Sequence, residues 1–276
     1  MARALIVGLG EVGSALYEIA SRVRGLELYG YDTDATKSKH RLDDIPKPID
    51  YIHITIPYTS EFVDIVGEYI SRFSPRIVFV HSTVAPGTTR RIFEKFGVAT
   101  VYTPVRGKHP NLRKHMLFWT KWIAVLPYNE GVVEEAKTHL ESMGMRVRVV
   151  DDVEGLELAK LWETAYRAIL IAAWQEIHRI AKSFGARLRT IAEFVAEVHR
   201  VLKDRPVYYP DVIGGHCLIP NINILRSVYE SKLLDFVLDS NTRRASEVGD
   251  PAIRREIDEV RDIYLNLTDR SYFEDP

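Results

Sequence analysis

The segment Ala4–Gly13, which reads Ala-Leu-Ile-Val-Gly-Leu-Gly-Glu-Val-Gly, constrains the fold of this chain more than any other segment. Its apolar residues predict a short buried strand, the glycines form a Gly-x-Gly-x-x-Gly turn, and Ser14–Arg24 have helical character. A glycine triplet alone is weak evidence, but the strand–turn–helix context gives it meaning. The context favours a dinucleotide-binding turn over a glycine-rich turn in another α/β fold.

Each glycine of this turn has an expected role. Gly8 allows the tight turn, Gly10 lets the backbone approach a pyrophosphate, and Gly13 lets the helix pack closely on the strand. A second expected strand, Leu26–Tyr31, ends in Asp32, where a carboxylate accepts from an adenosine ribose and repels a 2′-phosphate. The sequence therefore predicts NAD rather than NADP. The residues of this region expected to bind NAD are Gly8, Leu9, Gly10, Glu11, Val12, Gly13 and Asp32.

Length and composition narrow the class of protein. A chain of 276 residues has room for one large or two modest domains. With 46% apolar residues and a net charge of −1, it gives no electrostatic argument for nucleic acid or a membrane surface. The longest apolar stretch, Ala168–Trp174, is too short to span a bilayer, and no leader precedes the first strand. We therefore expect a cytoplasmic protein.

The single cysteine, Cys217, excludes an internal disulfide and makes a cysteine-based metal site unexpected, so we predict no metal. Gln175 is the only glutamine, and arginine outnumbers lysine. This usage hints at a thermophilic source.

The order of strands and helices predicts the fold class. Strand-like runs after Asp32 alternate with helical stretches such as Ser60–Phe73 and Gly131–Met143. Alternation of this kind indicates an α/β fold with a Rossmann-type, doubly wound parallel sheet, which we place in residues 1–150. The expected strands are Tyr51–Ile56, Ile77–His81, Thr100–Tyr102, Trp122–Leu126 and Val147–Val150.

The second half, residues 151–276, is expected to form an all-helical domain. One long connecting helix, Glu154–Phe184, ends at Gly185, and a loop is expected over Lys203–Cys217. Apolar residues along the long helix fit a homodimer interface over residues 154–184, and burial within one chain is an equal alternative. Further helices are expected at Arg187–Leu202, Ile222–Val237 and Pro251–Leu265.

Three later segments carry a family resemblance. They are His81–Thr89 after the fourth strand, Glu157–Ala168 in the long helix, and Ile213-Gly214-Gly215-His216-Cys217 in the loop. In this order, after the N-terminal glycine motif, they resemble the nucleotide-sugar 6-dehydrogenases, which include UDP-glucose, GDP-mannose and UDP-N-acetylmannosamine dehydrogenases. That family carries a further C-terminal nucleotide-binding domain, which we expect this chain to lack. A separate subunit then supplies that domain, or the substrate has no nucleotide.

The resemblance implies an NAD-dependent oxidation of a sugar alcohol to a carboxylate through a cysteine adduct. It implies that Cys217 is the nucleophile, Lys160 the general base or alkoxide stabiliser, and Thr83 a residue that positions cofactor or water. A thiolate needs a cationic or dipolar neighbour, and a basic lysine needs burial or a like charge. The resemblance also adds Pro57, Ser82 and Thr83 to the expected NAD-binding residues.

The expected substrate site combines a basic segment with residues of the helical half. Arg106–His115 is densely basic and lies where the family's substrate loop begins, so an anionic substrate is expected; a solvated basic segment is the alternative. The residues expected to contact the substrate are Arg106, Lys108, His109, Thr164, His216 and Asn221.

Three positions depart from the family pattern. Val105 stands where the family has a glutamate, Thr164 where it has an asparagine, and Asn221 where it has an aspartate. Valine cannot transfer a proton, so thioester hydrolysis by the family's route is in doubt. Two alternatives therefore stay open: a two-electron hydroxy-acid or sugar-acid dehydrogenase that uses Lys160 without a cysteine adduct, and a non-catalytic NAD-binding protein.

Overall fold

The computed structural model describes residues 1–108 and 110–267, and it divides into two compact units. The sheet unit comprises Met1–Lys160 and the helical unit begins at Leu161. The expected end of the first domain at residue 150 coincides with the end of the last strand. The boundary between the units lies farther on, within the long helix α6 (Val153–Ser183), which begins in the sheet unit and continues into the helical unit.

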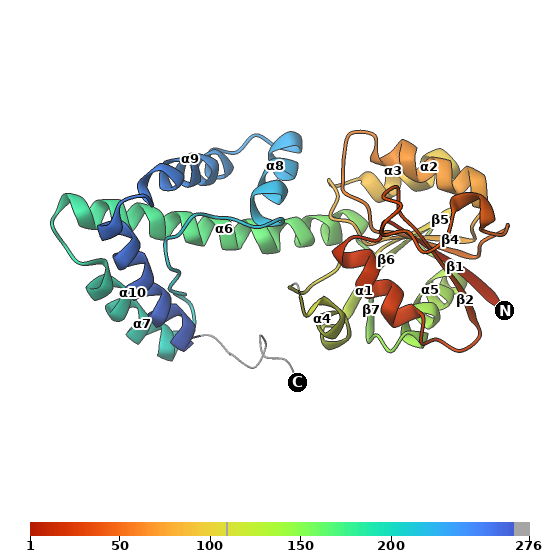
Figure 1. Ribbon diagram of the computed structural model, residues 1–276, viewed down its shortest axis with the longest axis horizontal. Coiled ribbons are helices and arrows are strands. Elements are labelled where there is room, and N and C mark those ends of the chain that lie inside the picture. Colours follow the sequence, from red (N-terminus) through yellow and green to blue (C-terminus); the bar gives the residue numbers. More distant parts are fainter. Residues whose placement is uncertain (109, 268–276) are drawn as a thin grey trace. The chain divides into compact units, whose positions relative to one another are not determined.

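The sheet unit contains seven strands in the order β2-β1-β3-β4-β5-β6-β7 (Figure 1). All neighbouring pairs are parallel except β5 and β6, which are antiparallel. The α/β class and the mostly parallel, doubly wound sheet are therefore confirmed. The strands are β1 (Ala2–Val7), β2 (Leu26–Tyr31), β3 (Tyr51–Ile54), β4 (Ile77–Val80), β5 (Ala99–Tyr102), β6 (Lys121–Leu126) and β7 (Val147–Val150).

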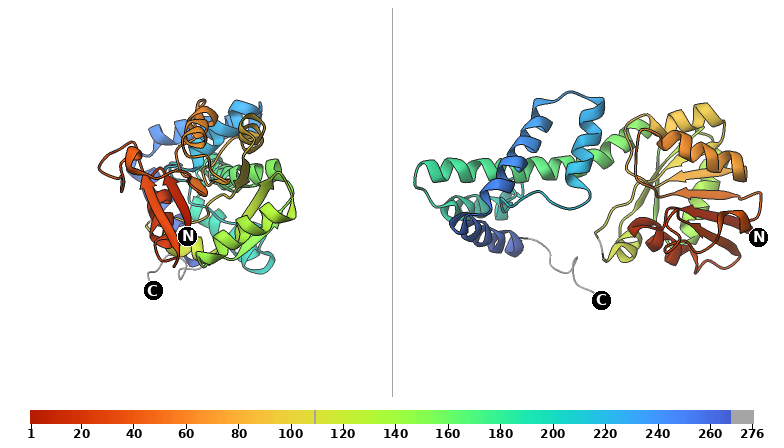
Figure 2. Two further views of the ribbon diagram at one scale, coloured as in Figure 1. Left: turned by 90° about the vertical axis from the view of Figure 1, so that its right-hand side faces the viewer. Right: turned by 45° about the horizontal axis from the view of Figure 1, so that its top comes forward.

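Helices cover both faces of this sheet (Figures 1 and 2). The alternation of side chains along β1 explains the two layers, because Ala4 and Ile6 face one core while Leu5 and Val7 face the other. The first core lies beneath α1 (Glu11–Ala20), α4 (Leu112–Phe118) and α5 (Glu130–Ser142). The second lies beneath α2 (Phe62–Phe73) and α3 (Thr88–Phe96), and a short 3-10 helix, η1, spans Leu42–Asp44.

The helical unit packs its later helices on α6. These helices are α7 (Leu188–Leu202), α8 (Leu218–Val228), α9 (Lys232–Glu247) and α10 (Pro251–Leu267). One apolar cluster joins α6 to α8 and α9, and another joins α6 to α7 and α10. Up to residue 267, the second half is thus all-helical around the loop that ends at Cys217, as predicted.

The single predicted helix Ile222–Val237 is wrong, because two helices occupy this region. α8 begins four residues earlier, at Leu218, since a proline such as Pro220 is tolerated in the first turn of a helix. It ends where Tyr229 adopts an extended backbone, and Ser231 is the N-cap of α9.

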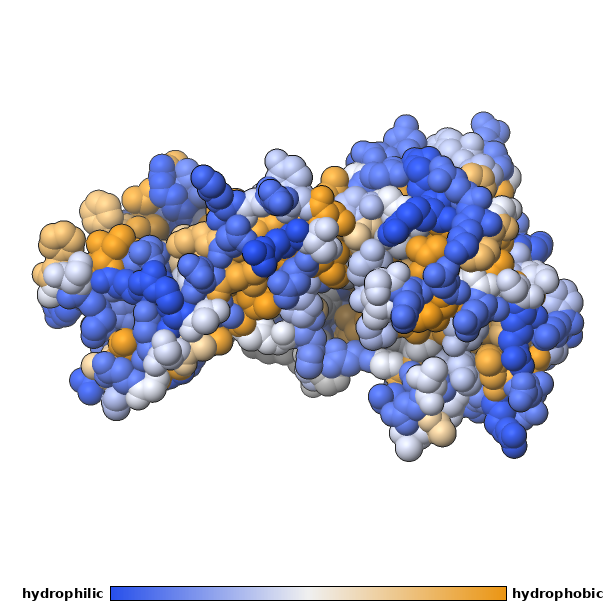
Figure 3. Space-filling view, turned by 90° about the horizontal axis from the view of Figure 1, so that it is seen from above, coloured by the Kyte–Doolittle hydropathy of each residue, from blue (hydrophilic) through white to orange (hydrophobic). Residues whose placement is uncertain are grey.

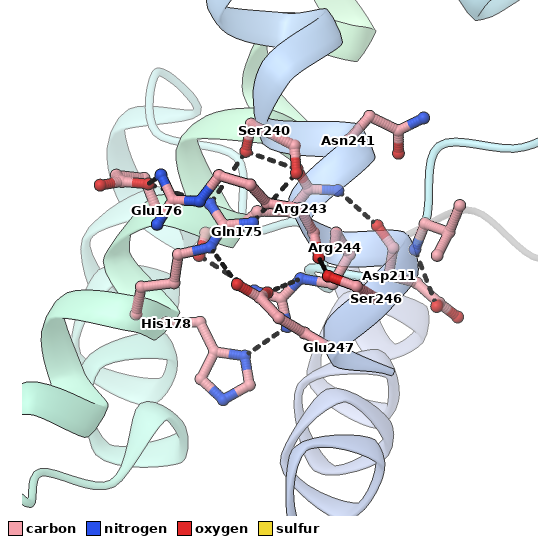
Figure 4. A network of polar contacts seen from close by, with 12 residues as sticks. Gln175, Glu176, His178, Asp211, Ser240, Asn241, Arg243, Arg244, Ser246 and Glu247 are labelled. Atoms are coloured by element: carbon pink, nitrogen blue, oxygen red, sulfur yellow. Dashed lines mark hydrogen bonds and ion pairs between the residues drawn. The ribbon is translucent and has the colours of Figure 1, made fainter. Parts of the chain in front are cut away.

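A buried polar network ties α9 to α6 within the helical unit (Figure 4). Arg244, 1% exposed, donates to the backbone carbonyl of Gln175 and bonds Nδ1 of His178. Ser240 donates to the side-chain oxygen of Gln175, whose amide donates to the carbonyl of Asp211. Since unpaired polar groups are costly in a core, these bonds fix one arrangement of α6, α9 and the loop before Cys217.

The face drawn in Figure 3 shows apolar residues on both units. In the part of the chain that the structure describes, most of the large apolar side chains that are exposed belong to the helical unit. Among the described residues, no helix combines the length and apolar character needed to cross a bilayer.

Candidate active site

The glycine turn has the geometry of a dinucleotide-binding turn. Gly8 has φ +90°, a conformation that favours glycine, and its N–H donates to the carbonyl of Tyr31 at 2.8 Å. A Cβ on Gly13 would lie 1.7 Å from the carbonyl oxygen of Gly8, so α1 packs against the turn only with glycine there. A Cβ on Gly10 would meet no atom within 4 Å. The turn therefore leaves open space at Gly10, directly before the N-terminus of α1.

Asp32 directly follows β2, and its carboxylate contacts the backbone of the glycine turn. Its Oδ2 accepts from the N–H of Leu9 at 2.6 Å, and its Oδ1 accepts from the N–H of Asp34 at 2.8 Å. Each carboxylate oxygen can accept a second bond, so the group remains able to bind a ribose hydroxyl. Thr55, which sequence reasoning did not single out, donates to the carbonyl oxygens of Val7 and Gly8.

The open space at Gly10, the N-terminus of α1 and the carboxylate of Asp32 are the features that an NAD molecule requires. The N–H groups of the first turn of α1 are free for phosphate oxygens, and the helix dipole favours an anion there. Pro57 is exposed after β3, while Ser82 is buried after β4 and donates to the carbonyl of Ile56 at 2.6 Å. Thr83 follows and is half-buried. The structure thus places these residues at the carboxyl ends of adjacent strands, where α/β sheets bind ligands.

Glu157 fixes the first turns of α6 against the loop after β4. The carboxylate is fully buried and accepts from the N–H of Gly87 and from both the N–H and hydroxyl of Thr89. Burial raises the pKa of Glu157, against the lowering effect of these hydrogen bonds. Lys160 follows one helical turn later and is half-buried, so this anchoring also determines the place of Lys160 in the sheet unit.

A buried lysine, Lys121, was missed by sequence reasoning. It is 4% exposed, and its Nζ donates to the carbonyl oxygens of Thr103 and Pro104, both at 2.9 Å. Burial lowers its pKa well below the usual range, and the charges of Lys160 and Arg106 lower it further. Lys121 is the first residue of β6, whose sequence is otherwise apolar. Nothing in the sequence distinguishes this lysine, and only the packing shows that it is buried.

The basic segment is partly helical. Arg106 donates to the carbonyl of Thr120 at 2.6 Å, and its guanidinium lies 5.0 Å from the ring centroid of Trp119. α4 begins at Leu112, and its buried His115 accepts from the N–H of Lys108 through Nδ1. Lys108 itself is exposed, and the predicted contact His109 lies outside the described residues. Val105, where the resemblance expects a glutamate, is buried among apolar residues.

The helical unit holds the remaining predicted residues. Cys217 is exposed and is the N-cap of α8, a position where the helix dipole stabilises a negative charge. The side chain of Asn241 accepts from the N–H of Ile213 and donates to its carbonyl, so it holds the loop just before the two glycines. His216 is exposed, whereas Thr164 and Asn221 are buried and bond each other. The structure thus brings Thr164 and Asn221 together in one unit, and it places Lys160 and Thr83 in the other.

Solved structures of dehydrogenases share this two-unit fold. The structure of a UDP-D-ManNAc dehydrogenase from Pyrococcus horikoshii matches with a TM-score of 0.74 and 18% identity, covering 90% of this chain and 70% of that one. A 3-hydroxyisobutyrate dehydrogenase from Mycobacterium tuberculosis matches with a TM-score of 0.66 and 17% identity, covering 95% and 99%. At these identities the likeness shows the fold.

Sequence comparison is more specific. Residues 154–246 match the UDP-glucose/GDP-mannose dehydrogenase family, central domain, which confirms the resemblance inferred from the motifs. The UDP-N-acetyl-D-mannosamine dehydrogenase of Methanocaldococcus jannaschii is 25% identical over 169 residues, which cover 59% of this chain. The match spans 38% of that curated relative's length.

Proposed function

We propose that this chain is an NAD-dependent dehydrogenase that oxidises an alcohol of a sugar nucleotide or a related anionic sugar. The observation that carries the proposal is the turn Gly8–Gly13, which leaves open space at Gly10 before the N-terminus of α1. The match of residues 154–246 to the family's central domain supports the substrate class, because that segment includes both Lys160 and Cys217.

The proposed roles follow from the positions of these residues. NAD, when bound at this turn, would supply the acceptor for the hydride of the alcohol carbon. Lys160 takes the hydroxyl proton or stabilises the alkoxide. Burial, together with the charges of Lys160 and Arg106, lowers the pKa of the neighbouring Lys121. Thr83 positions the reacting groups after β4. Cys217 at the N-cap of α8 forms the adduct with the aldehyde, since a helix N-terminus favours a thiolate.

The cationic groups of the sheet unit support an anionic substrate. Arg106 and Lys160 both act electrostatically on the buried amine of Lys121, so these two cationic groups lie near it. We propose that Arg106 and Lys108 lead the contacts to a phosphate or carboxylate. A charge reversal, Arg106→Glu, is expected to raise KM for the substrate; an unchanged KM contradicts this part.

A two-electron oxidation of a hydroxy acid or sugar acid is the second candidate. Buried Val105 favours it, because no carboxylate at that position can assist hydrolysis of a thioester. Under this alternative Lys160 is essential while Cys217 is not.

We further propose a homodimer through the long helix. Leu158, Trp162 and Tyr166 lie four residues apart along α6 and are 45%, 50% and 50% exposed, so they form an apolar stripe. A cytoplasmic location and a thermophilic source stay predictions from the sequence.

The test is the NADH yield per mole of substrate, measured with UDP- and GDP-sugars, sugar phosphates and hydroxy acids. Two NADH from a sugar nucleotide support the leading proposal, and one NADH supports the two-electron alternative. Tight NAD binding without any turnover overturns both and favours a non-catalytic NAD-binding protein.

The variants Cys217→Ala and Lys160→Ala separate the two enzymes. The leading proposal expects both to lose activity, whereas the alternative expects loss only in Lys160→Ala. Arg226→Ala, an exposed residue on α8 paired with Asp235, is the matched control and is expected to retain activity.

A further inference from the structure

Three buried histidines of the sheet unit form a hydrogen-bonded chain. Nε2 of His81 lies 2.9 Å from Nδ1 of His53, and Nε2 of His53 lies 2.9 Å from Nε2 of His139. The three residues are 2%, 0% and 6% exposed. His53 is in the middle of β3, His81 follows β4, and His139 is on α5. Neither the glycine turn nor the family resemblance gives these imidazoles a role.

The surroundings keep the three rings neutral. His53 stacks on Phe79, with ring centroids 4.8 Å apart, and His139 lies against Tyr51 at 4.0 Å. Burial lowers the pKa of His139 to about 4. Burial also lowers the pKa of His53 and His81 well below the usual range, and the charge of Lys121 contributes to both. A neutral imidazole has one N–H donor and one acceptor, so the N–H groups must all point the same way along the chain.

The inner end of the chain lies at the ligand-binding edge of the sheet. His81 directly precedes Ser82 and Thr83, the residues proposed to contact the cofactor. Its Nδ1 is buried and has no hydrogen-bond partner among the described residues. Lys121 acts electrostatically on His81, and Lys160 acts on Lys121. A buried nitrogen without a hydrogen bond is energetically costly. A hydrogen-bonding group that reaches this edge of the sheet during catalysis would satisfy Nδ1 of His81.

The outer end lies at the opposite edge of the sheet. His139 lines a surface pocket with Ala2, Leu26 and Tyr51, which begin the first three strands. Glu135 also lines this pocket and accepts from the hydroxyl of Tyr51 at 3.0 Å. Arg76 pairs with Glu135 at 3.0 Å and with Asp50 at 3.1 Å. The chain of imidazoles therefore connects the carboxyl edge of the sheet with an opening at its amino edge that is lined in part by polar side chains.

We propose that His81, His53 and His139 form a proton relay that carries the proton of alcohol oxidation along one face of the sheet, beneath α5, to this pocket. The inference rests on the proposed function, because each two-electron oxidation of an alcohol releases one proton. In this relay the three histidines act as acid–base residues of the reaction, and the proton leaves through them.

The transfer balances at every ring. Nδ1 of His81 gains a proton, and the proton on its Nε2 passes to Nδ1 of His53. The proton on Nε2 of His53 passes to Nε2 of His139, and Nδ1 of His139 releases its proton to water in the pocket. Each imidazole ends neutral, in the opposite tautomer. The reverse transfer restores the first tautomers after the product leaves, when water at the inner end takes the proton from His81.

The first test uses ¹⁵N-histidine labelling and requires no turnover. We expect three neutral rings at pH 7, and we expect His139→Phe to change the ¹⁵N tautomer signature of His81, two rings away. Phenylalanine preserves the contact with Tyr51 while removing both ring nitrogens. The control His40→Asn removes a histidine of the same unit and keeps an acceptor for the N–H of Gly30. Unchanged His81 signals in His139→Phe overturn the relay.

The second test follows NADH and the proton separately in a single turnover, with absorbance for NADH and a pH indicator for the proton. We expect both to appear together in the wild type and in His40→Asn. In His139→Phe and His53→Phe, proton release should lag behind NADH by about tenfold or more. Simultaneous release in His139→Phe overturns the relay, even where His53→Phe does not fold. Absence of NADH in every protein contradicts the proposed function instead, and the labelling test then decides the coupling of the rings.

Discussion

The side-chain amide of Asn221 donates a hydrogen bond of 2.8 Å to the hydroxyl of Thr164, which itself donates to the carbonyl of Leu161. Both residues are buried, and both occupy positions where the chain departs from the pattern of the family it resembles. The two departures therefore form one mutually satisfied pair between α6 and α8. We infer that they stabilise the packing of α8, which begins directly after Cys217.

Thr164→Val should destabilise the protein, because it leaves the amide of Asn221 buried without its partner. We expect the free energy of unfolding to fall by about 1–3 kcal/mol, measured by urea denaturation. The double variant Thr164→Val with Asn221→Leu should recover part of this loss, since neither polar group is then left unpaired. Strictly additive effects of the two substitutions contradict the pairing.

Alanine at Gly10 and at Gly13 should have different effects. Gly10→Ala meets open space in the protein, so it should leave the melting temperature unchanged and weaken NAD binding about tenfold or more, since the methyl group occupies the path of the pyrophosphate. Gly13→Ala places a Cβ 1.7 Å from a backbone oxygen and should lower the melting temperature itself. Calorimetric titration with NAD and thermal unfolding separate the two outcomes. Equal affinity for NAD in Gly10→Ala argues against the proposed cofactor site.

The buried histidines should make stability depend on pH below neutrality. Burial lowers the pKa of His139 to about 4, whereas the unfolded chain binds a proton near pH 6.5. Between these values the unfolded state holds more protons, so the free energy of unfolding should decrease as the pH falls from about 6.5 to 4. Each such histidine contributes up to about 1.4 kcal/mol per pH unit. Urea denaturation between pH 7 and 5 measures the slope, which should become shallower in His139→Phe and stay the same in His40→Asn.

The apolar stripe on α6 should control the oligomeric state. Replacing Trp162 and Tyr166, whose rings stack with centroids 6.3 Å apart, by glutamate should convert a dimer into a monomer, because charges resist burial in an apolar interface. Sedimentation velocity measures this change. Phe194→Glu, at an aromatic residue of α7 that is 73% exposed, is the matched control. A wild-type protein that sediments as a monomer at all concentrations contradicts the proposed interface.

Much of the sheet could be predicted because its signals are local. The glycine turn, the apolar strand runs and the long helix each depend on residues close in sequence, and β7 has the predicted bounds. The break between α8 and α9 was missed, because Tyr229–Ser231 interrupt a continuous helical pattern with only a weak signal, a serine N-cap. Lys121 and Thr55 were missed as well, since their partners are carbonyl oxygens far away in sequence, that of Thr103 for Lys121 and that of Val7 for Thr55.

The sequence by itself determined the glycine turn and the order of the strands, because motif spacing and periodicity are properties of neighbouring residues. The family resemblance of the sequence supplied Lys160 and Cys217 as candidates. Only the tertiary structure decided that Thr164 pairs with Asn221 and that three imidazoles lie in series. His53 is 28 residues from His81 and 86 residues from His139 along the chain. The register of β3 on β4 and the packing of α5 on the sheet bring them within hydrogen-bonding distance. Such contacts follow from how elements pack, which no short stretch of sequence specifies.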